Sequence, residues 1–473
     1  MAKRELSLKT GDNIRLEITG ITHTCDGVGR FDGMAVFVPG AVPGETVSAT
    51  LVERKKTYAR ARLLEVIHPS PNRRKPDCPH YWACGGCHLQ HLDYNEHLRL
   101  KTKLVRDSLQ RIADLDKVPV RDTIGMDSPW NYRNKVHFQV HRGEDGLQMG
   151  FYEEGSHSPI ALFNEVHTSV PGCLLVDKGL NEAAQVVEGL LNKYRPKPIP
   201  PQSNTQCFHH VMLRKSFTTG EVMVILVTGA ETWQQEKKFT SELLSQRHEI
   251  TSLYRNINTG SSGPILGKEN RLLAGQPHIK DKLEDLFFLI SPPSFFQVNP
   301  VQTLVLYRKA LEYIQTESVN TPIIIDAYSG IGTIALFMAG QAKQVYGLEE
   351  VPEAVEDARR NAQLNDIKNV EFLLGKVENK LPEMATRGMR PDVIVLDPPR
   401  SGCRPEVLKA VADMETPRVV YISCDPGTLA RDLKILASMG YRVEEVQPVD
   451  MFPWTYHVES IVLMMNSGLE DKK

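Results

Sequence analysis

The chain has 473 residues, of which 41% are hydrophobic and 24% are charged, and its formal net charge is −2. This length predicts roughly three domains, and no apolar run approaches the roughly 18 residues that a membrane-spanning helix needs. No apolar stretch that could serve as a signal peptide follows residues 1–5, so we expect a cytoplasmic protein. In that reducing compartment eight cysteines are not expected to form a disulfide framework, and clustered ones require a metal or catalytic explanation.

The first 75 residues are basic, with 13 Lys and Arg against 8 Asp and Glu, although the whole chain is slightly acidic. From Gly11 to His68, short alternating apolar and polar runs are separated by turns such as Asp32-Gly33, which predicts a small antiparallel barrel. A basic group in its last hairpin could bind phosphates, or it could be a solvated edge that prevents strand aggregation. This group consists of Arg54, Lys55, Lys56, Arg60 and Arg62.

A cysteine cluster follows the barrel. Cys78, Cys84 and Cys87 have a C-x5-C-x2-C spacing, and two glycines between the last two allow the backbone to fold around a centre. Cys173, far along the chain, is available as a fourth ligand. Zinc is the alternative, but four-cysteine zinc sites are usually built from paired C-x2-C knuckles, so the single knuckle favours a 4Fe-4S cluster. The cysteines without such neighbours are interpreted as structural: Cys25, Cys207 and Cys403.

The remaining elements change in character along the chain. Helical spacing of apolar residues predicts helices around 93–113 and 177–194, whereas strand-like runs dominate the rest of 132–290. After Pro292 strands alternate with helices, which predicts a doubly wound α/β sheet. The predicted strands of this sheet are Pro322–Ile325, Gln344–Leu348, Val370–Leu374, Asp392–Leu396 and Arg418–Ser423.

The first predicted strand of that sheet leads into a glycine-rich turn with Gly330 and Gly332, where the backbone can approach a ligand closely. The next strand ends in Glu349, whose carboxylate could bind ribose hydroxyls. These residues alone also fit a dinucleotide dehydrogenase. The motif Asp397-Pro398-Pro399-Arg400 favours a different enzyme, because prolines after a strand form a rigid loop that can point a carboxylate into the ligand crevice.

Two further residues carry the chemistry. Cys424 follows a buried strand and directly precedes a predicted helix, whose positive end is expected to lower the pKa of the thiol. Glu459 interrupts the last apolar strand, and a partly buried glutamate is expected to have a raised pKa and to exchange a proton near neutral pH. The neighbouring His457 is interpreted as structural. The sequence thus pairs a candidate nucleophile with a candidate base.

These motifs together resemble the RNA 5-methyluridine methyltransferases, especially the branch that modifies 23S ribosomal RNA. The resemblance covers nearly the whole chain and implies an α/β multidomain protein. Residues 1–69 resemble the TRAM domain, an OB-like RNA-binding barrel. Residues 70–290 are similar to a central α+β domain with an iron-sulfur cluster, and 291–467 to a Rossmann-like class I methyltransferase domain.

The resemblance also implies roles for single residues. Cys424 falls at the position of the nucleophile and Glu459 at that of the base. Gln297, in a Ser-Phe-Phe-Gln-Val-Asn segment, is expected to contact cofactor or target base, and the other S-adenosylmethionine-binding positions are Tyr328, Glu349 and Asp397. Tyr328 stands where relatives often have phenylalanine, which keeps a stacking role. The three-plus-one cysteine pattern matches the family's 4Fe-4S ligands, Cys78, Cys84, Cys87 and Cys173.

The expected reaction is methylation of uridine C5 through a covalent intermediate, because uracil C5 is too weakly nucleophilic to react unaided. The target must leave its stack, so RNA is the expected partner; no membrane and no obligate protein partner are expected. A transfer RNA target is the closest alternative. A non-catalytic RNA-binding or assembly protein, a nicotinamide-dependent oxidoreductase and a cytosine-5 RNA methyltransferase remain as further alternatives.

Overall fold

A computed structural model describes residues 9–143, 146–163, 172–194, 207–229, 232–260, 263–315 and 321–470. The chain divides into two compact units, which are described separately. The first contains Met1–Leu104 together with Trp454–His457, and the second contains Val105–Pro453 and Val458–Lys473. No helix in the described ranges is both long and apolar enough to cross a membrane.

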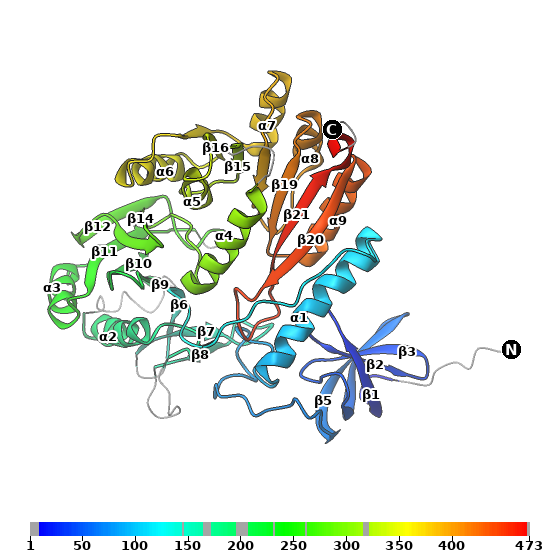
Figure 1. The fold of residues 1–473 in the computed structure, drawn as a ribbon. Coiled ribbons are helices and arrows are strands. Elements are labelled where there is room, and N and C mark those ends of the chain that lie inside the picture. The colour runs from blue at the N-terminus through cyan, green and yellow to red at the C-terminus, as the bar shows by residue number, and fades with distance from the viewer. Residues whose placement is uncertain are drawn as a thin grey trace. The chain divides into compact units, whose positions relative to one another are not determined.

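The first unit begins with a closed five-stranded barrel, as the sequence predicts (Figure 1). Residues alternate between buried and exposed along its strands, and Ile14, Leu16 and Ile18 point into its core. Asp32 and Gly33 both have positive φ angles, 47° and 82°, as the turn between two hairpin strands requires. In spatial order the strands are β1 (Asn13–Ile21), β2 (Gly27–Phe31), β3 (Met34–Val38), β5 (Tyr58–His68) and β4 (Thr46–Arg54).

Beyond the barrel, the first unit consists of turns and the start of helix α1 (Tyr94–Ser108), which continues into the π-helical turn Leu109–Ala113. Trp454 is 1% exposed and packs against the rings of Tyr94 and His97, with centroids 5.2 and 5.7 Å away. Its carbonyl accepts hydrogen bonds from the backbone of residues 88 and 89. A residue near the C-terminus of the chain is therefore part of the N-terminal unit.

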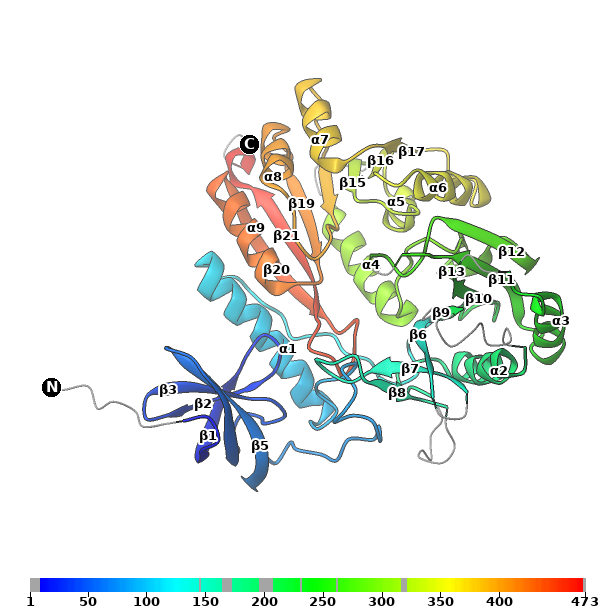
Figure 2. The ribbon, with the colours of Figure 1, turned by 180° about the vertical axis from the view of Figure 1, so that it is seen from behind.

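The second unit contains a seven-stranded sheet, which forms most of the middle region. Helices α2 (Lys178–Tyr194) and α3 (Glu236–Gln246) pack against each other beside it (Figure 2). A separate hairpin, β13 (Ile279–Leu283) and β14 (Leu286–Ile290), leads out of this region. The sheet strands, in spatial order, are β12 (Glu269–Gly275), β11 (Ile250–Ile257), β10 (Val222–Thr228), β9 (Phe208–Lys215), β6 (Lys135–Arg142), β7 (Leu147–Tyr152) and β8 (Pro159–Ala161).

The same unit holds a second seven-stranded sheet, and this sheet is doubly wound. Five of its strands are parallel, and the last two pair antiparallel, as in class I methyltransferases. In spatial order the strands are β17 (Val370–Leu374), β16 (Gln344–Glu349), β15 (Ile323–Ala327), β18 (Val393–Leu396), β19 (Arg418–Ser423), β21 (Glu459–Asn466) and β20 (Tyr441–Val449). The predicted fold class is confirmed.

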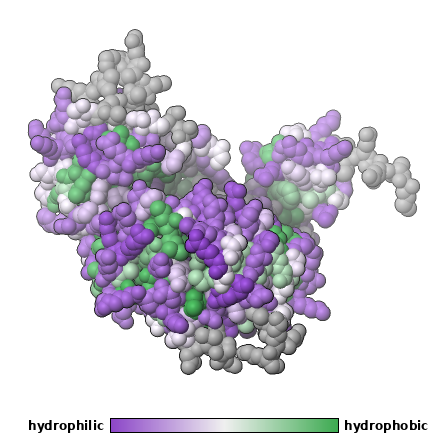
Figure 3. All heavy atoms as spheres, turned by 90° about the horizontal axis from the view of Figure 1, so that it is seen from above, coloured by the Kyte–Doolittle hydropathy of each residue, from purple (hydrophilic) through white to green (hydrophobic). Residues whose placement is uncertain are grey.

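Helices cover both faces of the doubly wound sheet, and apolar side chains fill the two layers between them. Parallel strands covered on both faces are expected to be apolar throughout, and all four residues of β18 are buried. Hydrophilic residues cover most of the face drawn in Figure 3, with hydrophobic residues in smaller areas between them. The covering helices are α4 (Pro300–Ile314), α5 (Thr333–Ala339), α6 (Pro352–Leu364), α7 (Val377–Thr386), α8 (Pro405–Asp413) and α9 (Pro426–Ser438).

Candidate active site

Four predicted site residues lie at one edge of the doubly wound sheet. Tyr328, Glu349, Asp397 and Cys424 each end or directly follow a strand, namely β15, β16, β18 and β19. These strands are parallel, so their carboxyl ends meet at the same edge (Figure 1). The strand order reverses between β15 and β18, and ligands bind in open α/β sheets at such a switch point.

The glycine-rich turn after β15 is held by Glu349. One carboxylate oxygen of Glu349 accepts a hydrogen bond from Gly330 N at 3.0 Å, and the other accepts one from Val351 N at 2.8 Å. Gly332 has a φ of 82°, and a Cβ there would lie 2.6 Å from the Phe372 ring, so a side chain cannot be accommodated. Each carboxylate oxygen keeps acceptor capacity for a ligand hydroxyl.

Carboxylates crowd this edge of the sheet. Burial raises the pKa of Asp397 to about 7. Asp326, which is 0% exposed, has a pKa well above its ordinary value because of burial, followed by the charges of Asp397 and Glu349. Two buried carboxyl groups that resist ionisation indicate a shortage of positive charge. A ligand with a positive charge would therefore be favoured at this position.

Cys424 lies between β19 and α9 and is half-buried. The prediction that the helix end lowers its pKa is wrong: the pKa is raised to about 12 by burial first and then by the charge of Glu459, with Arg400 acting in the opposite direction. Asp425 caps α9 and accepts a hydrogen bond from Thr428 N at 2.8 Å. A carboxylate thus sits at the helix end, where it offsets the positive potential that the prediction relied on.

Glu459 begins β21 and is 5% exposed. Strand β21 runs antiparallel to β19, with Ser460 opposite Ser423. Continuing this register by one residue brings Glu459 opposite Cys424. The charge of Glu459 also affects the pKa of Cys424, which agrees with that proximity. The structure therefore brings together the predicted nucleophile and the predicted base.

Gln297, 9% exposed, lies in the loop between β14 and α4. Its carbonyl accepts a hydrogen bond from Asn134 Nδ2 at 3.1 Å, and the Val298 carbonyl accepts one from Asn134 N at 2.9 Å. Asn299 caps α4 through Gln302 N at 3.2 Å. The start of β6 in the first sheet thus anchors the loop that carries Gln297.

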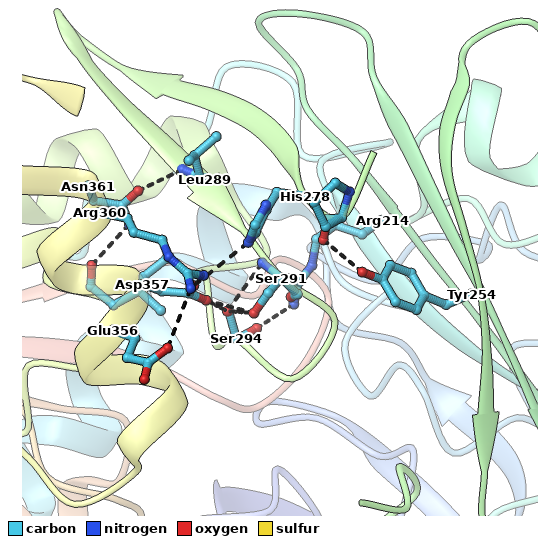
Figure 4. Close-up of polar contacts among 12 residues, drawn as sticks. Arg214, Tyr254, His278, Leu289, Ser291, Ser294, Glu356, Asp357, Arg360 and Asn361 are labelled. Atoms are coloured by element: carbon cyan, nitrogen blue, oxygen red, sulfur yellow. Dashed lines mark hydrogen bonds and ion pairs between the residues drawn. The ribbon is translucent and has the colours of Figure 1, made fainter. Parts of the chain in front are cut away.

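A buried polar network, with residues from α6 and β9, also anchors this loop. No sequence motif predicts it. Asp357 accepts hydrogen bonds from the hydroxyls of Ser291 and Ser294 at 2.6 and 2.7 Å. Arg214, 2% exposed, donates to the Ser294 carbonyl at 2.7 Å. Figure 4 shows these side chains converging on the segment before Gln297. No local pattern in the sequence marks these residues, because they come from three distant segments.

The predicted metal-binding cysteines are divided between the two units. Cys78, Cys84 and Cys87 are partly exposed in the first unit, where Gly86 N donates to Cys84 Sγ at 3.4 Å, whereas Cys173 belongs to the second unit. Across the described ranges, no three His, Cys, Asp or Glu side chains lie close enough to hold a metal ion. Cysteine thiolates are the usual ligands of iron-sulfur clusters, and these residues therefore fit one chemically. The four-cysteine site stays a prediction.

Comparison with known families identifies two regions of the chain. Residues 217–467 match the family described as tRNA (Uracil-5-)-methyltransferase, and residues 8–64 match the TRAM domain. An uncharacterized RNA methyltransferase of Halalkalibacterium halodurans is 42% identical over 464 residues, which are 98% of this chain and 99% of the relative. One of Clostridium tetani is 39% identical over 471 residues, covering 100% of both chains.

A solved structure is also similar over nearly the whole chain. The tRNA (uracil-54, C5)-methyltransferase of Pyrococcus abyssi, in complex with S-adenosyl-L-homocysteine, has a TM-score of 0.74 and 27% sequence identity. The match covers 96% of this chain and 100% of that one. Both the sequence and the fold therefore agree with the family that the strand-end motifs suggest.

Proposed function

Because the chain belongs to the RNA uracil-C5 methyltransferase family, in which S-adenosylmethionine is the methyl donor, we propose that it methylates specific uridines of 23S ribosomal RNA. Cys424 is the nucleophile in this proposal, and Glu459 is the base that removes the C5 proton. The observation that carries it is the β19–β21 register, which brings Glu459 opposite Cys424 at the edge that also bears Asp397 and Glu349. One edge thus combines the residues for covalent attack, proton removal and cofactor binding.

The residues at this edge fit S-adenosylmethionine. The bare backbone at Gly330, where a Cβ would meet nothing within 4 Å, leaves room for close approach, and Glu349 can accept hydrogen bonds from ribose hydroxyls. Asp397 and Asp326 are buried carboxyl groups whose ionised forms a cationic ligand would favour. Tyr328 and Gln297 complete the proposed set of cofactor-contacting residues. When bound, S-adenosylmethionine supplies a methyl group carried on a sulfonium ion.

The chain's own residues perform the remaining steps. The Cys424 thiolate adds to C6 of the uracil, which makes C5 nucleophilic. Once C5 carries the methyl group, Glu459 removes the C5 proton; the C6–S bond then breaks and the thiolate is regenerated. Arg400, whose charge lowers the pKa of Cys424 against the effect of burial, favours the thiolate. The sum of these steps replaces one C5 hydrogen by a methyl group.

The ribosomal target rests on the parts outside the catalytic sheet. We assign RNA binding to the barrel in residues 1–69, a 4Fe-4S cluster on Cys78, Cys84, Cys87 and Cys173 to the middle region 70–290, and catalysis to 291–467. A cluster would serve the fold and RNA positioning, since methyl transfer requires no redox step. Bacterial transfer RNA enzymes that these sequences resemble usually lack both the barrel and the cysteines.

A transfer RNA uridine is the second candidate. The Pyrococcus abyssi enzyme acts on transfer RNA by its description, and it aligns with 96% of this chain, barrel included. The catalytic residues would be the same for both RNAs. The difference therefore concerns only the substrate that the surrounding surfaces accept.

The test is incubation of the protein with labelled S-adenosylmethionine and either unmodified 23S rRNA or unmodified transfer RNA, followed by mapping of 5-methyluridine. Label in 23S rRNA that Cys424→Ala removes, by at least about 10³-fold, supports the proposal. Cys207→Ala is the matched control and should keep activity. Label only in transfer RNA would overturn the ribosomal target, and no label in either RNA would overturn the reaction.

A further inference from the structure

One face of strand β6 carries a row of partly exposed polar side chains. Residues at odd positions of the strand are half-buried, whereas the alternate residues Val136, Phe138 and Val140 are almost fully buried. Across the strand pair, His210 of β9 lies opposite Gln139 and therefore shares its face. We refer to these side chains as the β6–β9 row: Lys135, His137, Gln139, His141 and His210.

The β6–β9 row consists of basic and hydrogen-bond-donating side chains, and it contains no carboxylate. Burial, followed by the positive charges of Lys135 and Arg214, lowers the pKa of His137 to about 3. Burial and the charge of Arg214 lower the pKa of Lys135 to about 7. Among the described residues, Nδ1 of His137, His141 and His210 is buried without a hydrogen-bond partner. Buried polar atoms normally have a partner, so these ring nitrogens suit a ligand that offers hydrogen-bonding oxygens.

The row begins beside the catalytic loop. Arg214 lies opposite Lys135 in the sheet, and side chains of such a pair lie on the same face. Arg214 reaches the carbonyls of Ser291 and Ser294, so this face is the one on which the Gln297 loop lies (Figure 4). Asn134, directly before Lys135, holds the Gln297 carbonyl at 3.1 Å. From that point the row runs away from the loop along β6.

We propose that the β6–β9 row binds the phosphodiester backbone of the substrate RNA on one side of the target uridine. This inference rests on the proposed function, because a strand whose base enters the Gln297 side of the active site must continue across a neighbouring surface. Same-face side chains of a strand recur about every 6.5 Å, so they form a linear array rather than a point-like anion site. Ammonium, imidazole and amide groups suit phosphate oxygens and ribose hydroxyls, and they bind without reading sequence.

The test compares the full-length protein with the double variant Lys135→Gln/His210→Gln, which replaces two basic side chains by neutral amides of similar size. We expect the KM for the RNA that the wild type methylates to rise about tenfold, with kcat within twofold and the S-adenosylmethionine Kd unchanged. The dependence of log KM on log salt should become shallower by about 1 for each phosphate that the variant no longer neutralises. The matched control, Lys238→Gln/His248→Gln, changes exposed side chains on and beside α3 and should shift none of these.

The outcomes separate this inference from the proposed function. Wild-type protein without methyl transfer to either RNA is a failure of the proposed function. Active wild type with an unchanged KM and salt slope in the double variant overturns the β6–β9 row as an RNA site. A fall in kcat at unchanged KM also overturns it, because it indicates a role in chemistry. Ultraviolet crosslinking of bound RNA to the wild-type protein gives a second readout, independent of variant folding: a crosslink in 135–142 supports the proposal, and crosslinks only elsewhere contradict it.

Discussion

The catalytic edge and the β6–β9 row are both partly buried, yet they carry opposite kinds of ionisable group. At the catalytic edge, burial raises the pKa values of Asp397 and Asp326, and for Asp326 the charges of nearby carboxylates add to the effect. Along the row, burial and then neighbouring positive charges lower the pKa values of Lys135 and His137. In the two proposals, the sulfonium cofactor binds at the edge and the RNA polyanion binds along the row.

Both regions therefore hold ionisable groups in surroundings that disfavour their charged forms. Such groups lower the stability of the protein without ligand, and ligand binding recovers that free energy. The thiol of Cys424 follows the same rule, since its pKa is raised to about 12 by burial and by the nearby Glu459. A positive ligand charge would bring that pKa down.

The largest expected effect comes from the base at the catalytic edge. Glu459→Gln keeps side-chain size but removes the proton acceptor, so kcat should fall by about 10² to 10⁴. The thiol should still add to C6, so a covalent protein–RNA complex should accumulate on a denaturing gel. Glu371→Gln, an exposed glutamate on β17 of the same sheet, is the control and should turn over normally. Normal turnover by Glu459→Gln would remove Glu459 from the mechanism.

Asp397→Asn separates binding from stability at the same edge. We expect the Kd for S-adenosylmethionine to rise by about 10-fold to 100-fold, equivalent to about 1.4 to 2.7 kcal/mol. The folded-state pKa of about 7 lies above the ordinary 3.8, so the native carboxyl retains its proton as pH rises from about 4 to about 7, and its contribution to stability falls over that range.

The neutral variant should therefore unfold at higher temperature than wild type at pH 8, by the equivalent of about 1 to 4 kcal/mol, and show little gain at pH 4. Asp366→Asn, at a position whose side chain is 86% exposed, should leave the unfolding temperature unchanged at both pH 4 and pH 8. Thermal unfolding monitored at both pH values provides the check. A gain of equal size at pH 4 and pH 8 would show that the charge of Asp397 is not its cause.

The alkylation rate of Cys424 reports whether the charge of the cofactor lowers the pKa of the thiol. With a pKa of about 12, its alkylation rate without cofactor should rise about tenfold per pH unit from pH 7 to 9 without a plateau. Bound S-adenosylmethionine should accelerate alkylation more than S-adenosylhomocysteine, which has the same shape but lacks the sulfonium charge. Mass spectrometry of the Cys424 peptide measures the rate. A plateau near pH 8 in the free protein would contradict the account.

The smallest expected effect concerns the network that links the two regions. Asp357→Ala removes the acceptor of the buried Ser294 hydroxyl and of the partly buried Ser291 hydroxyl, so it should cost about 2 kcal/mol of unfolding free energy. Activity should fall only a few-fold, since the loop remains held by Asn134. Urea unfolding measures the change, and Asp285→Ala, with an exposed side chain, is the control. A neutral result for Asp357→Ala would show that the loop does not depend on this network.

The sequence was most informative where function lies in short contiguous motifs. Tyr328, Glu349, Asp397 and Cys424 each follow a strand that is visible as an apolar run, and parallel strands place such ends at one edge. The barrel was predictable for a similar reason, because its alternation and its turn residues are local. Family resemblance added the roles of these residues, which remain proposals.

The features that the sequence does not predict depend on contacts between distant segments of the chain. Proximity to the helix end predicts the wrong direction for the pKa of Cys424, because the pKa is raised first by burial, which no local pattern reports, and then by the charge of Glu459, 35 residues further along the chain. Arg214, Ser294 and Asp357 meet only in the folded protein. The cysteine spacing is visible in the sequence, whereas the geometry of a cluster is not.

The central claim is covalent attack by Cys424 on uracil C6, and RNA containing 5-fluorouridine at the target position tests it most directly. Fluorine at C5 leaves no proton for Glu459 to remove, so the enzyme bound to RNA and S-adenosylmethionine should stall as a complex that survives denaturation. Protease digestion should map the crosslink to Cys424, and the Cys424→Ala variant should form no crosslink. No stable complex with an active wild type, or a crosslink at Cys403 instead, would contradict it.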